Sequence, residues 1–166
     1  RVLGVTIGDV RFLNLYVPNG KEVGSDKYAY KLDWLEKLQA HVEAQLAGHA
    51  KFVAVGDFNI APEECDVHDP AGWADSVLFS PLEREAFQGL LNALADAFRL
   101  FEQEQNTWSW WDYRMGAFRR NMGLRIDHIL VSSALEKACT ACRIDREPRT
   151  WERPSDHAPV VAEFSL

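Results

Sequence analysis

The stretch Phe52-Val53-Ala54-Val55-Gly56-Asp57-Phe58-Asn59 joins a short, continuously apolar run to a polar turn. An apolar run of this kind predicts a strand that is buried on both faces of a sheet. Asp57 and Asn59 follow the run directly, and these residue types either close turns through backbone hydrogen bonds or carry chemistry. The stretch therefore predicts an interior strand that ends in a polar turn, and both interpretations of the turn stay open at this point.

Further strands are predicted on both sides of this run. Their ranges, chosen for β-branched and aromatic residues, are 2–7, 10–17, 124–132 and 160–164. Gly8 and Asp9 separate the first two ranges, which is a hairpin signal. Neighbouring strand pairs of this kind predict a largely antiparallel or mixed sheet.

Two helices are predicted between these strands. The first begins at Ser25 or Asp26, either of which can cap it, and runs to about residue 46. Its apolar residues follow a three/four spacing and predict one buried face, formed by Tyr28, Leu32, Leu35, Leu38, Val42 and Leu46. The second begins at Ser80-Pro81-Leu82-Glu83, a capping box with proline at the first helical position. Its predicted buried face comprises Phe87, Leu90, Leu91, Leu94 and Phe98, while residues 61–79 are expected to form a long loop.

Composition indicates one soluble domain over residues 1–166. The chain has 166 residues, of which 47% are apolar and 26% charged, and it has no apolar run near the ~20 residues of a membrane helix. The net charge of −7 argues against binding to DNA through overall charge, although an acidic enzyme can still use a local basic patch. Cys139 and Cys142 lack a nearby His pair for a zinc site, so we interpret them as ordinary thiols in a reducing, cytoplasmic compartment.

Polar residues that suit phosphate chemistry lie in or beside the predicted strands. They are Tyr16, Asp57, Asn59, Asp127, Asp156 and His157. Carboxylate oxygens bind hard cations such as Mg²⁺, and a His oriented by a carboxylate can take a proton from water. The set is typical of metal-assisted hydrolysis of a phosphate ester. Taken singly, Tyr16 suits a core position and the Asp156–His157 pair suits the surface. Asp127 lies in an apolar strand, which favours a functional role, because a buried carboxylate needs a partner or a function.

Six strings, in order along the chain, resemble the motifs of one superfamily. They are NLYVPNG at 14–20, KYAYKL at 27–32, GDFN at 56–59, TWSWWDYR at 107–114, GLRID at 123–127 and SDHAP at 155–159. Together they resemble the exonuclease III/abasic-site endonuclease branch of the endonuclease/exonuclease/phosphatase superfamily. The resemblance implies an α+β fold, the DNase I-like four-layer α/β/β/α sandwich. It also implies a DNA repair nuclease that acts on double-stranded DNA at abasic sites or 3′ ends, with Mg²⁺ or Mn²⁺ as cofactor.

The resemblance implies a role for each of the polar residues. His157 would be the base or proton partner near the scissile phosphate, and Asp127 would orient it. Asp57 would lie by the attacking water or the leaving oxygen, Asn59 would bond a phosphate oxygen, and Tyr16 would contact the phosphate. The implied metal site comprises Asp156, Asp57 and Asn59. How acid and base roles divide between Asp57 and His157 stays open.

Residues 108–126 are predicted to contact DNA. Arg114, Arg119, Arg120 and Arg125 stand against Asp112 alone, which is a local positive excess in an acidic protein. Arginines beside aromatic residues suit contact with phosphates, sugars and bases, although a solvated loop with core tryptophans is the alternative. By the resemblance, the DNA-binding residues are Trp110, Arg114, Met115, Arg119, Arg120, Asn121, Leu124 and Ile126. Trp110, Leu124 and Ile126 would line a pocket for an extruded abasic sugar.

The resemblance covers the larger, C-terminal part of the family's domain. The family begins with an Asn-containing strand and a later metal-binding Glu, and neither motif is found in these residues. We therefore predict an incomplete domain, lacking the N-terminal strands, with weak or absent activity alone and with exposed sheet edges that favour self-association. Two other functions stay open: a phosphatase of the same superfamily that acts on a non-DNA phosphoester, and a non-catalytic DNA-binding fragment.

Overall fold

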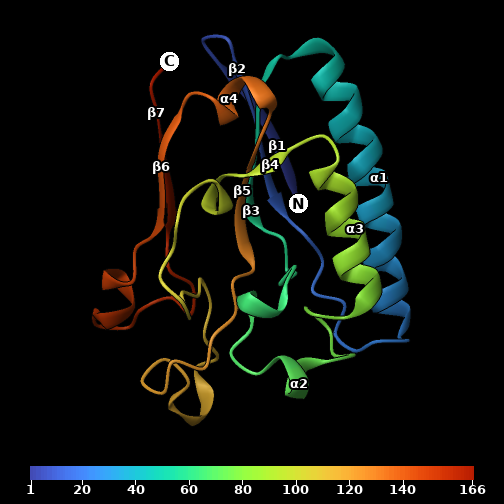
Figure 1. Ribbon diagram of the computed structural model, residues 1–166. Coiled ribbons are helices and arrows are strands. Elements are labelled where there is room, and N and C mark those ends of the chain that lie inside the picture. Colours follow the sequence, from blue (N-terminus) through green and yellow to red (C-terminus); the bar gives the residue numbers. More distant parts are fainter.

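The computed structural model describes residues 1–166, and a five-stranded mixed sheet forms its centre (Figure 1). The strand order is β1-β2-β3-β5-β4. The strands are β1 (Val2–Ile7), β2 (Val10–Tyr16), β3 (Lys51–Asp57), β4 (Ala95–Asp96) and β5 (Asp127–Val131). β2 runs parallel to β3, whereas β1 pairs antiparallel with β2 and β5 antiparallel with β3. The predicted opening hairpin, the buried central strand and the mixed sheet are all confirmed.

Two helices cover one face of this sheet. α1 (Asp26–Gly48) and α3 (Pro81–Leu91) pack side by side against it (Figure 1). The Ser25 hydroxyl caps α1 by accepting the N–H of Tyr28 at 3.2 Å, and the predicted capping box begins α3. Apolar side chains of both helices form one core with β2 and β3, as their spacing predicted.

The second predicted helix face is too long. α3 ends at Leu91, so Leu94 and Phe98 lie beyond it. Leu94 still packs in the core beneath the helices, but Phe98 belongs to the 3₁₀ turn Ala97–Leu100 and packs on the opposite face of the sheet. A capping box marks where a helix begins, whereas apolar spacing alone does not separate a helix from an apolar turn that follows it.

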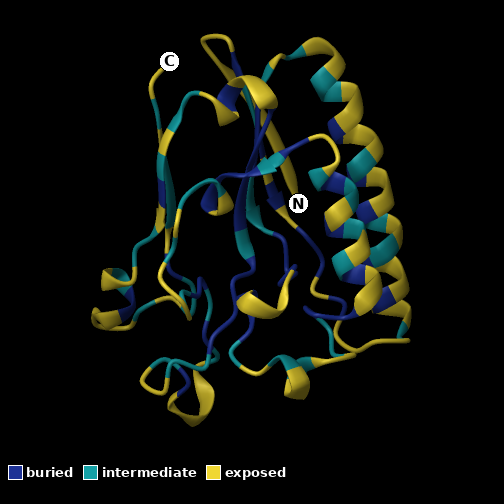
Figure 2. Ribbon diagram, viewed as in Figure 1, coloured by how far each residue is buried: buried dark blue, intermediate teal, exposed yellow.

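A small antiparallel sheet of β6 (Cys139–Ile144) and β7 (Val160–Phe164) covers the opposite face (Figure 1). A second core fills the space between the two sheets, and Figure 2 shows the buried residues concentrated in the strands of the large sheet. β7 was predicted and β6 was not. The chain thus forms three layers, with helices, large sheet and small sheet in that order, and the predicted α+β class is confirmed. No further helical layer covers β6 and β7.

Short turns complete the chain at the ends of the sheet. They are the helices α2 (Pro70–Trp73) and α4 (Ser133–Glu136) and the 3₁₀ helices Glu64–Asp66, Ala97–Leu100, Arg114–Gly116 and Glu147–Thr150. The segments that follow β2 and β3 and precede β5 and β7 gather at one end, the lower end in Figure 1. No helix combines the length and apolarity that crossing a membrane requires.

Gly56 allows β2 and β3 to approach closely. Its φ is +136°, and a Cβ atom built there would lie 2.0 Å from the carbonyl oxygen of Leu15. No side chain fits at that distance, and the φ angle itself favours glycine. Gly56 therefore permits the register in which Tyr16 lies opposite Asp57.

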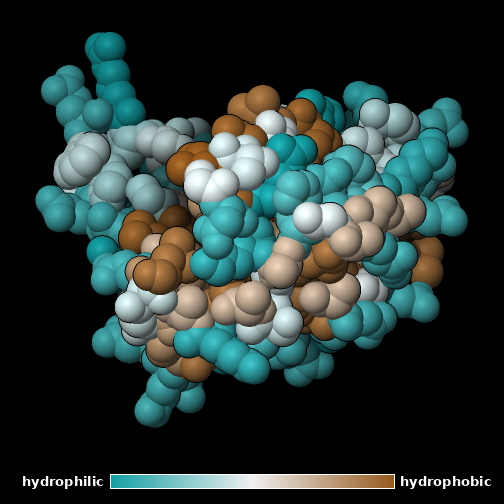
Figure 3. Space-filling view, turned by 90° about the horizontal axis from the view of Figure 1, so that it is seen from above, coloured by the Kyte–Doolittle hydropathy of each residue, from teal (hydrophilic) through white to brown (hydrophobic).

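β1 is an edge strand, and all of its residues are exposed. Leu3 and Ile7 expose 65% and 64% of their surface. Figure 3 shows further apolar patches between polar side chains at one end of the molecule. The exposed edge that the sequence predicted is therefore present.

Candidate active site

The register of three strands places three predicted site residues in one row. Tyr16 pairs with Asp57 across β2 and β3, and Asp57 pairs with Asp127 across β3 and β5. Directly paired residues point to the same face of a sheet. Val55 and Ile129, two positions away on β3 and β5, pack in the core toward β6 and β7, so the row points to that side.

His157 joins this row through Asp127. Its Nδ1 lies 2.8 Å from Oδ2 of Asp127, so an Nδ1–H donates to the carboxylate and Nε2 is left for a ligand. Burial alone would lower the pKa of His157, but the hydrogen bond to Asp127 and the charges of Asp57 and Asp156 outweigh it and raise that pKa. The predicted pairing of His157 with Asp127 is therefore present, and the imidazole holds its proton more readily than a free His.

Asp57 has a pKa close to neutrality. Burial and the negative charge of Asp127 raise it from 3.8 to about 6, although the N–H of Asn59 and the nearby His157 act in the opposite direction. A carboxylate with such a pKa can take up a proton at physiological pH, which is the property that a general base needs.

The turn after β3 is a backbone turn and a polar site at once. Asn59 has a φ of 52°, and its backbone N–H donates to Oδ1 of Asp57 at 2.8 Å. Its Nδ2 donates to Oδ2 of Asp57 and to the carbonyl of Val17, both at 3.0 Å, while its Oδ1 accepts from Asn19 at 3.1 Å. The two interpretations of this turn are therefore compatible. Asn19 was not predicted as a site residue, although it stands in the string at 14–20.

Ser109 and Trp110 bond the two segments that carry Asp127 and Asp156. The Ser109 hydroxyl accepts the backbone N–H groups of Ile126 and Asp127, both at 3.0 Å. Nε1 of Trp110 donates to Oδ2 of Asp156 at 3.0 Å. Trp110 thus contacts a carboxylate of the site directly. Ser109 was missed because a Ser in an aromatic loop carries no recognisable signal by itself.

Three potential metal ligands lie close together in this site. Ligand atoms of Asp57, Asp127 and His157 lie within 4.8 Å of one another. Asp156, one of the predicted ligands, accepts from Trp110 with Oδ2. Carboxylate oxygens suit a hard cation such as Mg²⁺. The predicted ligand set of Asp156, Asp57 and Asn59 stays a prediction.

A cleft of about 450 Å³ opens beside the His157–Asp127 pair. Residues from β2, β3, β5 and the start of β7 line it, including Asn14, Val55, Asp127, His157 and Val160. A ligand in this cleft can reach both members of the pair.

The predicted DNA-contacting residues in the loop around residues 112–121 differ in their exposure to solvent. Arg114, Met115, Arg119 and Arg120 are exposed, Met115 by 79%. Asn121 is turned inward: its Nδ2 donates to the carbonyl of Asn106 at 3.1 Å, and its Oδ1 accepts Nε1 of Trp111 at 3.3 Å. The exposed members suit contact with a polyanion, whereas Asn121 holds the loop together.

Leu124 and Ile126 lie in a buried cluster with Val67 and Phe79 and are 0% and 2% exposed. Trp110 is half-buried against the same cluster. The lining of a sugar pocket by these three residues stays a prediction, and it requires Leu124 and Ile126 to become accessible.

Arg125 does not contribute to the surface charge, contrary to the sequence-based count. Its side chain is 1% exposed and pairs with Asp66 (Nε to Oδ1, 2.6 Å) and Asp96 (Nη1 to Oδ2, 2.7 Å). Nη1 also donates to Nδ1 of His128 at 3.0 Å, and Nε2 of His128 then donates to the Ile60 carbonyl at 2.8 Å. Burial lowers the pKa of His128 to about 3, so this ring is neutral.

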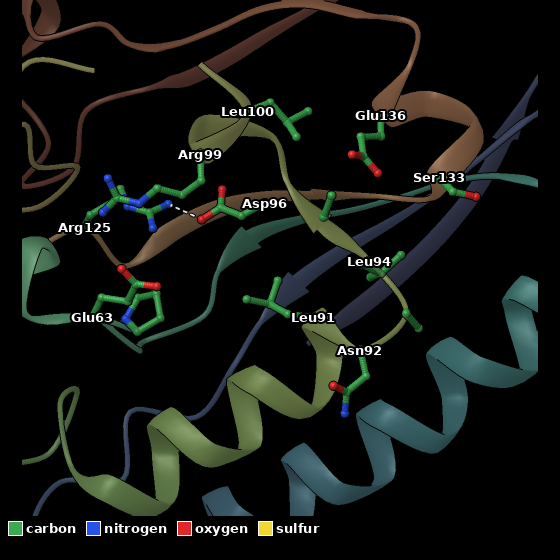
Figure 4. A pocket seen from close by; sticks show the side chains of 13 residues that line it. Glu63, Leu91, Asn92, Leu94, Asp96, Arg99, Leu100, Arg125, Ser133 and Glu136 are labelled. Carbon is green, nitrogen blue, oxygen red and sulfur yellow. Dashed lines mark hydrogen bonds and ion pairs between the residues drawn. The ribbon is translucent and has the colours of Figure 1, made fainter. Parts of the chain in front are cut away.

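A second cavity of about 510 Å³ lies above this cluster (Figure 4). Figure 4 shows Arg125 bonded to Asp96, with Glu63, Arg99 and Glu136 around the cavity. None of the predicted site residues lines it. Arg99 and Arg125, its cations, are already paired with buried carboxylates. The candidate active site is therefore the cleft at His157.

The three cysteines are free thiols. Burial raises the pKa of Cys142 to about 12, and burial also raises the pKa of Cys139. Neither thiol is activated, which agrees with their interpretation as ordinary thiols.

Known proteins resemble the chain over almost all of its length. The model of the endonuclease/exonuclease/phosphatase family matches residues 2–157. Exodeoxyribonuclease III of Haemophilus influenzae is 35% identical over 171 residues, which cover 98% of this chain and 64% of that protein. An exodeoxyribonuclease of Bacillus subtilis is 33% identical over 162 residues, which cover 96% of this chain and 62% of that protein. The chain therefore spans less than two thirds of the length of these curated relatives.

Solved structures resemble the fold just described. A 3′ phosphatase from Neisseria, solved with a product DNA hairpin, superposes with a TM-score of 0.98 at 44% identity and covers 100% of this chain and 65% of that chain. An AP endonuclease from Archaeoglobus fulgidus superposes with a TM-score of 0.95 at 36% identity, with the same coverage of each chain. The DNase I-like fold is thus confirmed, and the match to the family model shows that the chain belongs to the endonuclease/exonuclease/phosphatase family.

Proposed function

We propose that the protein is a DNA repair hydrolase of the exonuclease III type, which cuts phosphodiester bonds at abasic sites and trims 3′ ends. The observation that carries this proposal is the His157–Asp127 pair beside Asp57, in a cleft that a ligand can enter. The names of the relatives, exodeoxyribonuclease III and a 3′ phosphatase bound to product DNA, support it.

The proposed mechanism follows from the proton affinities of the site. Asp57, with a pKa of about 6, takes a proton from the attacking water. The new bond to phosphorus forms as the bond to the leaving 3′ oxygen breaks, and solvent protonates that oxygen. His157 keeps its proton through Asp127, so Nε2–H can donate to a phosphate oxygen. Tyr16 lies beside Asp57 and supplies a further donor, while Asn59 holds the Asp57 carboxylate through two hydrogen bonds.

A divalent cation completes this proposal. Mg²⁺, or Mn²⁺ in its place, would neutralise charge on the phosphate when bound. Asp156, Asp57 and Asn59 would hold it, because oxygen donors suit both ions. Asp156 lies close enough to raise the pKa of His157, and it adds negative charge at the same place.

The exposed arginines favour DNA over a small phosphoester. Arg114, Arg119 and Arg120 project from one loop near the site, with Met115 and Tyr113 exposed among them. A string of cations next to accessible apolar side chains suits a phosphate backbone with neighbouring bases. Duplex DNA with an abasic site or a free 3′ end is therefore the proposed substrate.

The test compares substrates on the purified protein with Mg²⁺. We expect at most slow incision of an abasic duplex or slow shortening of a 3′ end, loss of the reaction in EDTA, and no release of phosphate from a phosphoinositide. Phosphate release from the lipid headgroup alone would instead identify a phosphatase. Salt-sensitive DNA binding without turnover would identify a non-catalytic binder. The weak activity expected of residues 1–166 alone is read in the same assay.

We also propose that molecules associate through the exposed edge of β1, where Leu3 and Ile7 are accessible. An unpaired edge strand with apolar side chains is a template for pairing with another strand. The expected cytoplasmic location, with nucleoid DNA as the substrate, likewise stays a prediction.

A further inference from the structure

Lys31 of α1 ends in the protein interior. Its side chain is 0% exposed, although lysine normally keeps its ammonium in water. Nζ donates to the carbonyl oxygen of Asn59 at 2.7 Å and to that of Asn19 at 3.1 Å, and it pairs with Glu83. An ammonium group has three N–H donors, so every donor of Lys31 is used.

Glu83 is equally saturated. Its Oε1 accepts the N–H of Leu78 at 3.1 Å besides Lys31, and its Oε2 accepts the N–H of Ser80 at 3.1 Å and the Ser80 hydroxyl. The ion pair therefore leaves no polar atom without a partner. Apolar residues of similar volume often replace a buried ion pair without loss of stability, so stability alone does not account for it.

The two carbonyls held by Lys31 belong to different loops of the proposed site. Asn19 follows β2 in the loop that begins beside Tyr16, and Asn59 follows β3 in the turn that begins at Asp57. The side chains of Asn19 and Asn59 also bond one another at 3.1 Å. The Lys31 ammonium thus binds the backbone carbonyls of Asn19 and Asn59, the two residues whose side-chain amides bond one another.

Asn59 has a left-handed backbone, with a φ of 52°, a region that Asn tolerates better than most residues with a side chain. The hydrogen bond from Lys31 fixes the direction of the Asn59 carbonyl and so restrains the ψ angle of this residue. Without that bond the turn would be free to shift, and the Asn59 amide would move with it from its positions beside Asp57 and Val17.

We propose that Lys31 is a positioning residue, whose buried ammonium locks the Asn59 turn against the Asn19 loop and so holds the Asn59 amide on the Asp57 carboxylate. The role of Asp57 in hydrolysis rests on the proposed nuclease function, whereas the locking of the turn does not. Lys31 does not itself reach the cleft, since its donors are all occupied by protein atoms.

The test replaces the ion pair with a neutral pair. The double variant Lys31→Met/Glu83→Gln removes both charges, so no buried charge loses its partner. Tyr28→Phe is the matched control, because it removes the 2.6 Å hydrogen bond to Ser80 in the same network without touching either carbonyl. Urea denaturation at several temperatures identifies one temperature at which the wild type, the double variant and Tyr28→Phe are all folded.

Two readouts separate positioning from folding. Without DNA or metal, NMR should show that the Asn59 side-chain amide of the wild type exchanges slowly, and that its signals shift and broaden in the double variant but not in Tyr28→Phe. On abasic duplex with Mg²⁺, kcat of the double variant should fall by about tenfold or more while KM changes by less than about threefold, since misplacing a group by about 1 Å has effects of this order.

Unchanged Asn59 amide signals in the double variant would overturn the locking of the turn, whatever the enzyme does to DNA. Shifted signals with kcat equal to that of Tyr28→Phe would overturn the positioning role. Should the double variant not fold, Lys31→Gln takes its place, because it keeps part of the hydrogen bonding. The same two outcomes then apply. A wild type that cleaves no DNA would sink the proposed function and leave the NMR result standing.

Discussion

Asp57 couples the pH of the solution to the stability of the protein. Its pKa is raised from 3.8 to about 6, so between these values the folded protein binds a proton that the unfolded chain has released. The free energy of unfolding therefore falls as pH rises through this window, by at most about 3 kcal/mol. Asp57→Asn does not ionise, so its stability relative to the wild type should increase between about pH 4 and about pH 7, while cleavage is lost.

Urea denaturation of the metal-free proteins at several pH values measures this difference. Its change with pH is the informative quantity, because Asn also loses one hydrogen bond with Asn59 at every pH. A difference that stays flat across the window would contradict the raised pKa of Asp57.

The His157–Asp127 pair predicts two linked effects. Asp127→Asn should lower the pKa of His157 in an NMR titration, because the carboxylate raises it. His157→Gln and Asp127→Asn should each slow DNA cleavage by about 10²- to 10³-fold, the usual loss when a donor that stabilises charge in the transition state is removed. DNA binding, measured in the absence of turnover, should stay near the wild-type level. Loss of binding in parallel with activity would show that the pair holds DNA before the reaction and does not act mainly in the transition state.

At the residue scale, the sequence predicted the side chains that the strand register brings together. Tyr16, Asp57 and Asp127 end or begin strands that the apolar patterns located, so register alone aligns them. Lys31 was missed because a lysine in an amphipathic helix is normally solvated, and only the folded loops show its partners. Arg125 was misjudged for the converse reason: its carboxylate partners lie far away in the sequence.

At the scale of elements, the loop that carries Arg114, Arg119 and Arg120 should determine the salt dependence of DNA binding. Each Arg→Ala variant should weaken binding on all sequences and reduce the slope of log K against log salt by about one, if each side chain contacts one phosphate. Lys37→Ala is the control, because Lys37 is an exposed cation on α1 that already pairs with Asp33. Equal slopes for all variants would remove this loop from the DNA interface.

The segments around β5 depend on Arg125 for their stability. Arg125→Met leaves Asp96 buried without a cation and leaves Asp66 with Arg99 alone, so urea denaturation should show a loss of about 3–5 kcal/mol. The exposed pair of Arg143 with Glu163 is the comparison, because Arg143→Met should cost less than about 1 kcal/mol. Similar losses in both variants would show that Arg125 is not a special support.

Elements in which apolar residues recur at a regular spacing were predicted well, whereas elements without such a pattern were not. β3 and α1 follow their patterns closely. β6 escaped prediction because it pairs only with β7 and alternates half-buried with exposed residues such as Thr140 and Arg143. β4 has two residues and is strand only because β5 lies beside it. Pairing between distant segments, which a local pattern does not contain, creates both strands.

At the scale of the whole molecule, the edge at β1 should govern association. Leu3→Lys and Ile7→Lys place charges on an exposed edge, so sedimentation at increasing concentration should show less self-association than in the wild type. Tyr30→Lys is the control, because it places the same charge on an exposed residue of α1 and leaves β1 unchanged. A wild type that stays monomeric at every concentration would contradict the proposed association.

The fold class was predictable from the sequence, but the meeting of the site segments at one end of the sheet was not. Alternating strands and helices indicate an α+β domain, yet no pattern states that the segments before β5 and β7 meet Asp57 at one end of the sheet. That meeting depends on backbone bonds such as the one from the N–H of Ala158 to the carbonyl of Ser109 at 2.7 Å.

The contact between Gly56 and the Leu15 carbonyl bears on how this protein can change by mutation. Alanine is the smallest replacement, and even one methyl group would force β2 and β3 apart at the end where Tyr16 and Asp57 stand. In a library that carries every amino acid at position 56, selection for DNA cleavage should return glycine alone. Position 4 on the edge strand should tolerate many side chains, because there the crowding atoms belong to the flexible Arg11 side chain.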